Sequence, residues 1–91
     1  MKYLICYDIK ENRIRRQIVK YLEGFAFRIQ ESVFSCEVSA AEMHRVQQEL
    51  LALAENASHP LLLIVPICKT CERSVWMHGE PLEERPPYLL V

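Results

Sequence analysis

The feature of this sequence that most constrains its fold is an alternation between two hydrophobic periods. Residues 3–9 are β-branched, aromatic or apolar except for one carboxylate near the end, which is typical of a buried central strand. From residue 12 the period lengthens to about four, with Ile14, Ile18 and Leu22 on one side and Gly24 after them. This second pattern predicts an amphipathic helix with a glycine at its C-terminal cap.

The same order returns later in the chain. Residues 25–38 regain β-type side chains with a period of two, and we expect two strands joined by a bend. Ser39 and Glu42 match a capping box, which predicts the start of a second helix. The apolar segment 61–67 follows as a strand, and Pro66 places it at an edge of the sheet or at a bulge, because proline cannot donate to the ladder.

The resulting βαββαβ order predicts an α+β, ferredoxin-like domain over residues 1–79, with an antiparallel sheet and both helices on one face. The other face of that sheet would then lack a cover. Residues 80–91 are a C-terminal tail that ends in an apolar segment, and we expect a strand from this tail to pair with a dimer partner. A homodimer is also expected because a chain of 91 residues buries only a modest share of its surface.

Composition narrows the class of protein. The chain is 51% hydrophobic and 25% charged, which is ordinary for a folded domain and too apolar for a disordered one. No apolar run approaches the roughly 18 residues of a membrane helix, and the first residues show no signal-peptide pattern. We therefore expect a cytoplasmic protein with no membrane partner.

Charge is distributed unevenly. The net charge is -1, yet residues 10–28 hold six basic and two acidic side chains. Arg13, Arg16 and Lys20 follow helical spacing and would form one stripe on the first helix. Such a stripe can follow a phosphate backbone, or it can be an ordinary solvated helix face. The segment alone leaves both interpretations open.

Asp8 is the residue that points most directly to chemistry. A carboxylate at the end of an apolar strand must be solvated, hydrogen-bonded or bound to a cation. A structural role in the following turn is one interpretation, and Mg²⁺ binding is the other, since this ion often uses only one or two carboxylates. A dimer axis near the ends of the first strands would pair Asp8 with its mate, and the pair could hold a cation that activates water against a phosphodiester.

Other candidate motifs are weaker. Cys68 and Cys71 have zinc-knuckle spacing, but no second close pair completes four ligands, so we expect unliganded thiols. The chain has two glycines and neither a Walker loop nor a dinucleotide-binding pattern, which disfavours ATP and dinucleotide chemistry. Tyr3, Tyr7 and Phe34 could stack on bases, although strand aromatics more often lie in the core.

Three motifs carry a resemblance to a known family: Tyr-Asp-Ile at 7–9, Arg-Ile-Arg-Arg at 13–16, and Arg-Ile-Gln-Glu-Ser-Val-Phe at 28–34. In this combination the chain resembles the Cas-two family of CRISPR-associated proteins over about residues 1–79. The resemblance implies a homodimer of ferredoxin-like protomers whose C-terminal strands cross to the partner.

The resemblance also implies a function in CRISPR adaptation, the acquisition of new spacers in antiviral defence. The dimer would sit between two dimers of the CRISPR integrase, the Cas-one protein, and help to hold the duplex DNA that is inserted. Members of the family are also described as metal-dependent endoribonucleases or double-stranded DNA nucleases, with the strand-end aspartate as the Mg²⁺ ligand.

By position, the resemblance makes Asp8 the Mg²⁺ ligand and catalytic residue. The basic candidates for contact with nucleic acid are Arg13, Arg15, Arg16, Lys20 and Arg28. The residues expected to shape the site are Tyr7, Ser32 and Phe34. The sequence departs from the family pattern at residues 58–60, and segment 61–67 has no arginine. The acidic stretch 80–84 suits contact with the integrase better than contact with DNA.

Three other functions are weighed against this one. The chain could be a catalytically silent scaffold that binds duplex DNA, with single-stranded RNA as a possible second ligand. It could also be an RRM-like RNA-binding module, but the required RNP1 pattern is absent. A regulatory ferredoxin-like domain that binds a small molecule finds no support in the residues.

Overall fold

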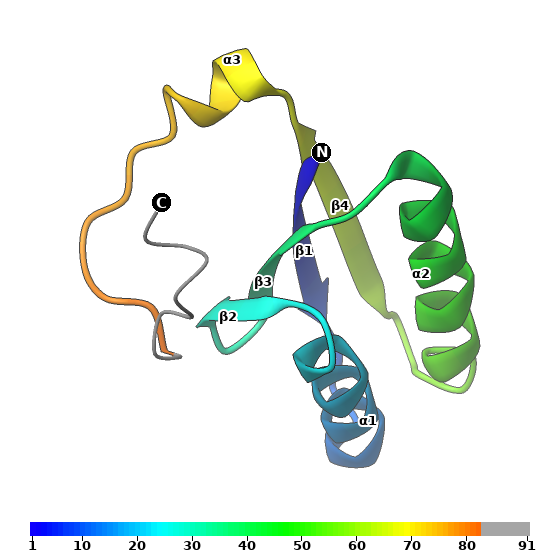
Figure 1. Cartoon of the computed structure of the whole chain (residues 1–91). Coiled ribbons are helices and arrows are strands. Elements are labelled where there is room, and N and C mark those ends of the chain that lie inside the picture. The colour runs from blue at the N-terminus through cyan, green and yellow to red at the C-terminus, as the bar shows by residue number, and fades with distance from the viewer. Residues whose placement is uncertain (83–91) are drawn as a thin grey trace.

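The computed structural model describes residues 1–82 and shows the elements in the expected order (Figure 1). The elements are β1 (Lys2–Asp8), α1 (Asn12–Glu23), β2 (Phe27–Gln30), β3 (Val33–Glu37), α2 (Ala40–Leu53), β4 (Leu61–Ile67) and a short α3 (Lys69–Glu72). The α+β class and the βαββαβ order are confirmed. The short helix α3 is an addition that the sequence patterns did not indicate.

The sheet has the strand order β2-β3-β1-β4, and every neighbouring pair is antiparallel. β1 is central, with Ile5 opposite Phe34 of β3 on one side and Ile64 of β4 on the other. β4 lies at an edge, which is the place that Pro66 predicts. This is the ferredoxin-like arrangement.

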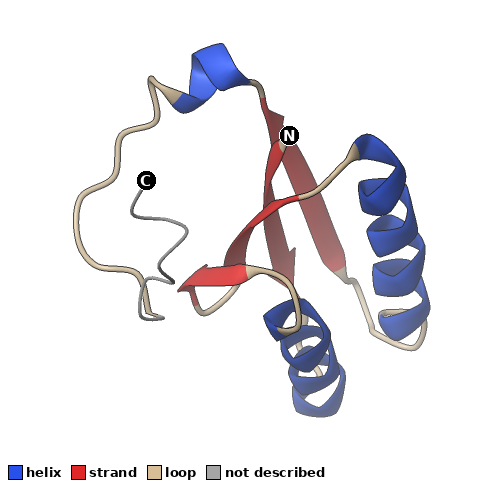
Figure 2. Cartoon of the chain, in the orientation of Figure 1, coloured by secondary structure: helices blue, strands red, loops and turns tan. Residues whose placement is uncertain are grey.

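Both long helices cover the same face of the sheet, while residues 75–82 lie on the opposite side (Figure 2). The largest fully buried side chains are Phe34, Ile5, Ile18, Leu22 and Leu50. They come from two strands and from both helices, so the core is the layer between the helices and the sheet. The start of α2 is fixed by the predicted capping box. Ser39 Oγ accepts from the Glu42 N–H at 3.1 Å, and the Ser39 N–H donates to Glu42 Oε1 at 3.0 Å.

The opposite side of β1 and β4 is here called the open face. Strand register places its residues in pairs across the two strands: Leu4 with Val65, Cys6 with Leu63, and Asp8 with Leu61. Leu61, Leu63 and Val65 are 53%, 49% and 38% exposed. The open face is therefore apolar along β4 and acidic at the end of β1.

The segment from Val75 to Leu82 is here called the arm. It leaves α3, passes over the open side of the sheet and returns to β2, where the Leu82 N–H donates to the Ile29 carbonyl at 3.0 Å (Figure 1). The arm and the sheet line a hollow of about 940 Å³ that is open to solvent. The expected partner-pairing strand falls in residues 83–91, which lie outside the described part of the chain. Within residues 1–82 no helix is long and apolar enough to cross a membrane.

Candidate metal and nucleic-acid site

Asp8 ends β1 on the open face. Its side chain is exposed, and its backbone lies opposite Leu61 in the sheet. Among the described residues its carboxylate forms no hydrogen bond and no ion pair. A carboxylate in this situation keeps its oxygens available to water or to a cation.

Each chain supplies one strand-end carboxylate, Asp8, to a candidate magnesium site. Residues 1–82 contain no cluster of three or more metal-binding side chains. Mg²⁺ commonly takes one or two carboxylates and fills its other positions with water and phosphate oxygens. Asp8 therefore fits a divalent cation whose other positions are filled by water, by a second carboxylate or by substrate oxygens.

Arg15 shapes the loop that follows Asp8. Its guanidinium donates to the Ile9 carbonyl at 2.9 Å and also to the side-chain oxygen of Asn12. Ile9 itself is buried. Arg15 thus fixes the path of the chain between β1 and α1, and this candidate for phosphate contact is already engaged within the protein.

A second contact at this end of the sheet joins residues far apart in the sequence. Glu11 Oε2 accepts from the Ser58 N–H at 2.9 Å and from Ser58 Oγ at 2.8 Å. These bonds from Ser58 hold the pKa of the Glu11 carboxyl below its ordinary value. Glu11 lies in the loop that follows Asp8, and Ser58 lies in the loop that leads to Leu61, the residue opposite Asp8 in the sheet. The Glu11–Ser58 contact therefore joins these two loops.

The sequence alone did not reveal this contact. Residues 58–60 stood out only as a departure from a family pattern, and Glu11 lay in a basic segment without a motif. The two partners are 47 positions apart, so no local spacing could have indicated that they meet.

Tyr7 and Arg28 converge on the turn between β2 and β3. The Tyr7 hydroxyl donates to the Glu31 carbonyl at 2.8 Å, and the Arg28 guanidinium donates to the same carbonyl at 2.9 Å. The Tyr7 N–H donates to the Ser32 carbonyl at 3.2 Å. Ser32, which the sequence predicts to shape the site, thus contributes its backbone carbonyl to this cluster.

Phe34 completes this cluster from inside the core. Its ring is fully buried, stacks on Tyr7 with centroids 6.3 Å apart, and lies 5.6 Å from the Arg28 guanidinium. Burial raises the pKa of Tyr7, and the positive charge of Arg28 partly offsets that effect. The cluster lies on the helix side of the sheet while Asp8 lies on the open face, so these residues support the end of β1 from behind.

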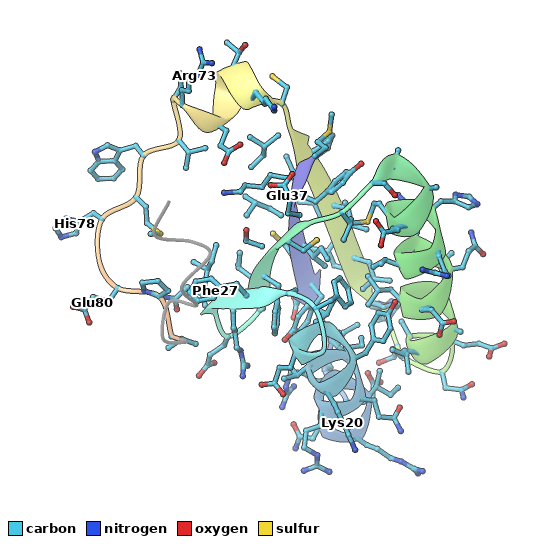
Figure 3. All side chains as sticks on the ribbon, in the orientation of Figure 1. Lys20, Phe27, Glu37, Arg73, His78 and Glu80 are labelled. Atoms are coloured by element: carbon cyan, nitrogen blue, oxygen red, sulfur yellow. The ribbon has the colours of Figure 1, made fainter. Side chains whose placement is uncertain are left out.

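The basic candidates do not form one surface. Arg13, Arg16 and Lys20 are exposed on α1, and Lys20 extends away from the helix (Figure 3). Arg15 and Arg28 instead make the internal contacts described above. The exposed stripe on α1 is therefore the part of the predicted set that is free to meet a phosphate backbone.

Fold and site together define a ferredoxin-like protein with an exposed aspartate at the end of its first strand and a basic stripe on its first helix. The family model described as CRISPR associated protein Cas2 matches residues 1–75. The chain therefore belongs to the CRISPR-associated Cas2 family, the Cas-two family whose motifs it carries.

Two relatives of known family agree with this assignment. The chain is similar to CRISPR-associated endoribonuclease Cas2 1 of Chloroflexus aurantiacus, with 34% identity over 88% of this chain and 86% of the relative. It is also 36% identical to CRISPR-associated endoribonuclease Cas2 4 of Rhodospirillum rubrum, over 99% of this chain and 73% of the relative. Both relatives are named endoribonucleases, which agrees with the endonuclease class that the sequence predicts.

Solved structures share the fold. Streptococcus pyogenes Cas2, crystallised at pH 6.5, superposes with a TM-score of 0.72 and 25% identity, covering 87% of this chain and all of that one. A hypothetical protein from Thermus thermophilus gives a TM-score of 0.73 at 24% identity over 91% of this chain and 96% of that one. Both structures share the ferredoxin-like architecture of this chain.

Proposed function

We propose that this chain acts in CRISPR adaptation as a homodimer that binds nucleic acid and cleaves phosphodiester bonds with Mg²⁺ held between two Asp8 carboxylates. The observation that carries the proposal is Asp8 itself, an exposed carboxylate at the end of an apolar strand with no partner among the described residues. The endoribonuclease names of the relatives support the same reaction class.

The open face supports the dimer. Leu61, Leu63 and Val65 are substantially exposed on an edge strand, where a second copy would remove apolar surface from water. Asp8 belongs to the same face, opposite Leu61. A two-fold contact through this face would bring two carboxylates toward each other, which one chain by itself does not achieve.

The roles of the residues follow from their positions. When bound, Mg²⁺ supplies Lewis acidity and lowers the pKa of a coordinated water. Asp8 would anchor the ion, and Arg15 and the Glu11–Ser58 contact would keep the surrounding loops in place. Arg13, Arg16 and Lys20 would attract the phosphate backbone, largely without regard to sequence.

The proposed partners are duplex DNA, single-stranded RNA and the dimers of the CRISPR integrase. The stripe on α1 suits either nucleic acid, because backbone contacts carry little sequence information. Glu80 extends outward from the arm (Figure 3), and an acidic surface there suits a protein partner better than DNA. The bridging of two integrase dimers rests on family resemblance.

The second candidate function is a catalytically silent DNA-binding scaffold in adaptation. It is favoured by the finding that residues 1–82 contain no group of three or more His, Cys, Asp or Glu side chains that could hold a metal ion. An RRM-like function loses its basis, because Tyr3 and Tyr7 are 7% and 3% exposed and point toward the helices. Aromatic rings in that position cannot stack on bases.

The deciding experiment compares cleavage and binding in one set of variants. Wild type, Asp8→Asn and an Arg13/Arg16→Ala double variant are incubated with labelled single-stranded RNA or duplex DNA, with Mg²⁺ or with EDTA. The nuclease proposal expects cleavage that requires Mg²⁺ and falls by about 100-fold or more in Asp8→Asn, since metal catalysis contributes several kcal/mol to lowering the barrier.

Oligomeric state and salt-dependent binding are measured on the same samples. Asp8→Asn should remain a dimer and bind nucleic acid as wild type does, whereas the arginine variant should lose affinity and salt dependence. If wild type cuts neither substrate and only the arginine variant loses binding, the scaffold function replaces the nuclease.

A further inference from the structure

Two cysteines lie where the chain leaves the sheet. Cys68 follows β4, and Cys71 lies one turn further on, within α3; both are exposed. The Cys71 N–H donates to Cys68 Sγ at 3.4 Å, because the extended backbone of Cys68, with φ -71° and ψ 166°, turns its side chain back over the helix. The two sulfur atoms therefore share one helical turn at the surface.

The two thiols differ in acidity. The hydrogen bond from the Cys71 backbone lowers the pKa of the Cys68 thiol. The hydrogen bond from the Cys71 thiol to Cys68, together with the charge that Cys68 carries when ionised, raises the pKa of Cys71. One sulfur of the pair is thus the better nucleophile and the other retains its proton, which is the division found in reactive Cys-X-X-Cys pairs.

The other two cysteines provide a contrast within the same chain. Cys36 is buried, and burial raises its pKa to about 11. Cys6 is half-buried on the open face. Neither has a second thiol within one turn, so the pairing is specific to Cys68 and Cys71 among the four.

We propose that Cys68 and Cys71 form a reactive dithiol that low-molecular-weight disulfides, such as glutathione disulfide, oxidise to an intrachain disulfide. The reaction goes beyond the proposed nuclease or scaffold function and does not depend on it. A metal-ligand function is less suited to the pair, because residues 1–82 hold no cluster of three or more metal-binding side chains and structural zinc requires four ligands.

The chemistry proceeds by two thiol–disulfide exchanges. The Cys68 thiolate attacks one sulfur of the small disulfide, forms a mixed disulfide and releases one thiolate. Cys71 then loses its proton to solvent and attacks Cys68 Sγ, which closes the Cys68–Cys71 bond and releases the second thiolate. The protein loses two electrons and two protons, and the small disulfide becomes two thiols.

The position of the pair gives this reaction a structural consequence. α3 is held to the sheet by the ion pair between Lys2 Nζ and Glu72 Oε2 at 3.0 Å, and the arm begins directly after it. A disulfide across the first turn of α3 would close the chain at the root of the arm. The redox state of the pair therefore acts at the junction between the sheet and the segment that leads to the C-terminus.

The test uses the full chain, fully reduced, in mixtures of reduced glutathione and glutathione disulfide of defined ratio. Samples are quenched with acid, free thiols are alkylated, and the peptides are identified by mass spectrometry. Wild type is compared with Cys68→Ser and Cys71→Ser, while Cys6 and Cys36 serve as internal controls.

Wild type is expected to lose two hydrogens in the peptide that contains both cysteines. Cys71→Ser should stop at a stable mixed disulfide on Cys68, and Cys68→Ser should react on the order of tenfold more slowly. The proposal is overturned if wild type accumulates mixed disulfides without closure, if the pair reacts no faster than Cys6, or if equimolar zinc binds the reduced pair and blocks exchange.

Discussion

The two faces of the sheet differ in exposure although both are built largely from apolar side chains. Along β1, Tyr3, Ile5 and Tyr7 face the helices and are 7%, 0% and 3% exposed. On the open face, the β4 residues Leu61, Leu63 and Val65 remain 38% to 53% exposed. Apolar composition therefore does not determine which side chains of the sheet are buried, whereas the direction in which each side chain points does.

Asp8 shows that side-chain direction also decides the exposure of a charged residue. It follows Tyr7 directly in β1, yet it faces the opposite side and is exposed. A carboxylate at a helix-facing position would be desolvated without a partner, at a cost of several kcal/mol. The open face can carry an acidic group because nothing in the described protomer buries it there.

The largest expected effect comes from removing a buried side chain on the face of the sheet that the helices cover. Phe34→Ala should lower the free energy of unfolding by about 3–5 kcal/mol, because a fully buried ring is replaced by a cavity. Urea titration followed by circular dichroism measures the change. Leu63→Ala on the open face is the control and should stay within about 0.5 kcal/mol at concentrations where the chain is monomeric; equal losses in both variants would remove the distinction between the faces.

The next prediction addresses the proposed dimer. Leu63→Asp should raise the dimer dissociation constant by at least about tenfold, because a leucine that the proposed contact would bury is exchanged for a charge. Sedimentation equilibrium measures it.

Leu51→Asp is the matched control for that experiment. Leu51 is 59% exposed on α2, which covers the other side of the sheet, so its change to Asp should leave the dimer intact. Dissociation of both variants alike, or of neither, would show that the open face is not the contact.

A smaller effect is expected at the start of α2. Ser39→Ala removes the hydroxyl that accepts from the Glu42 N–H and should cost about 0.5–2 kcal/mol of unfolding free energy. Ser39→Asp restores an acceptor and should recover most of the loss in the same urea titration. A full loss with Asp as well would mean that local capping does little to hold the helices on the covered face.

The smallest effect is a pH dependence at the Glu11–Ser58 contact between the β1–α1 and α2–β4 loops. The pKa of Glu11 is lowered in the folded chain by Ser58, so its contribution is present above the ordinary glutamate pKa of 4.5 and is lost as the pH falls through the folded value. Wild type should exceed Glu11→Gln in stability at pH 7 and lose that advantage progressively as the pH falls below 4.5. Glu55→Gln, at an exposed position after α2, is the control; a difference that is independent of pH would contradict the prediction.

Local patterns in the sequence were sufficient to predict the four strands and the two long helices, and to single out one candidate site residue. The capping box at Ser39 and Glu42, the helical spacing of Ile14, Ile18 and Leu22, and the edge position implied by Pro66 all match the structure. Asp8 was also recognisable, as the carboxylate that ends an apolar strand. Each of these signals depends on residues within a few positions of one another, where backbone geometry alone brings them together.

Only the tertiary structure decided which residues meet across long separations. It bonded Glu11 to Ser58, directed Arg15 to the Ile9 carbonyl, and placed Arg28 over Phe34 instead of on the basic surface. The sequence alone does not distinguish a charged residue that faces solvent from one that supports a turn. Its role depends on the packing of distant segments, which is settled when the whole sheet and its helices assemble.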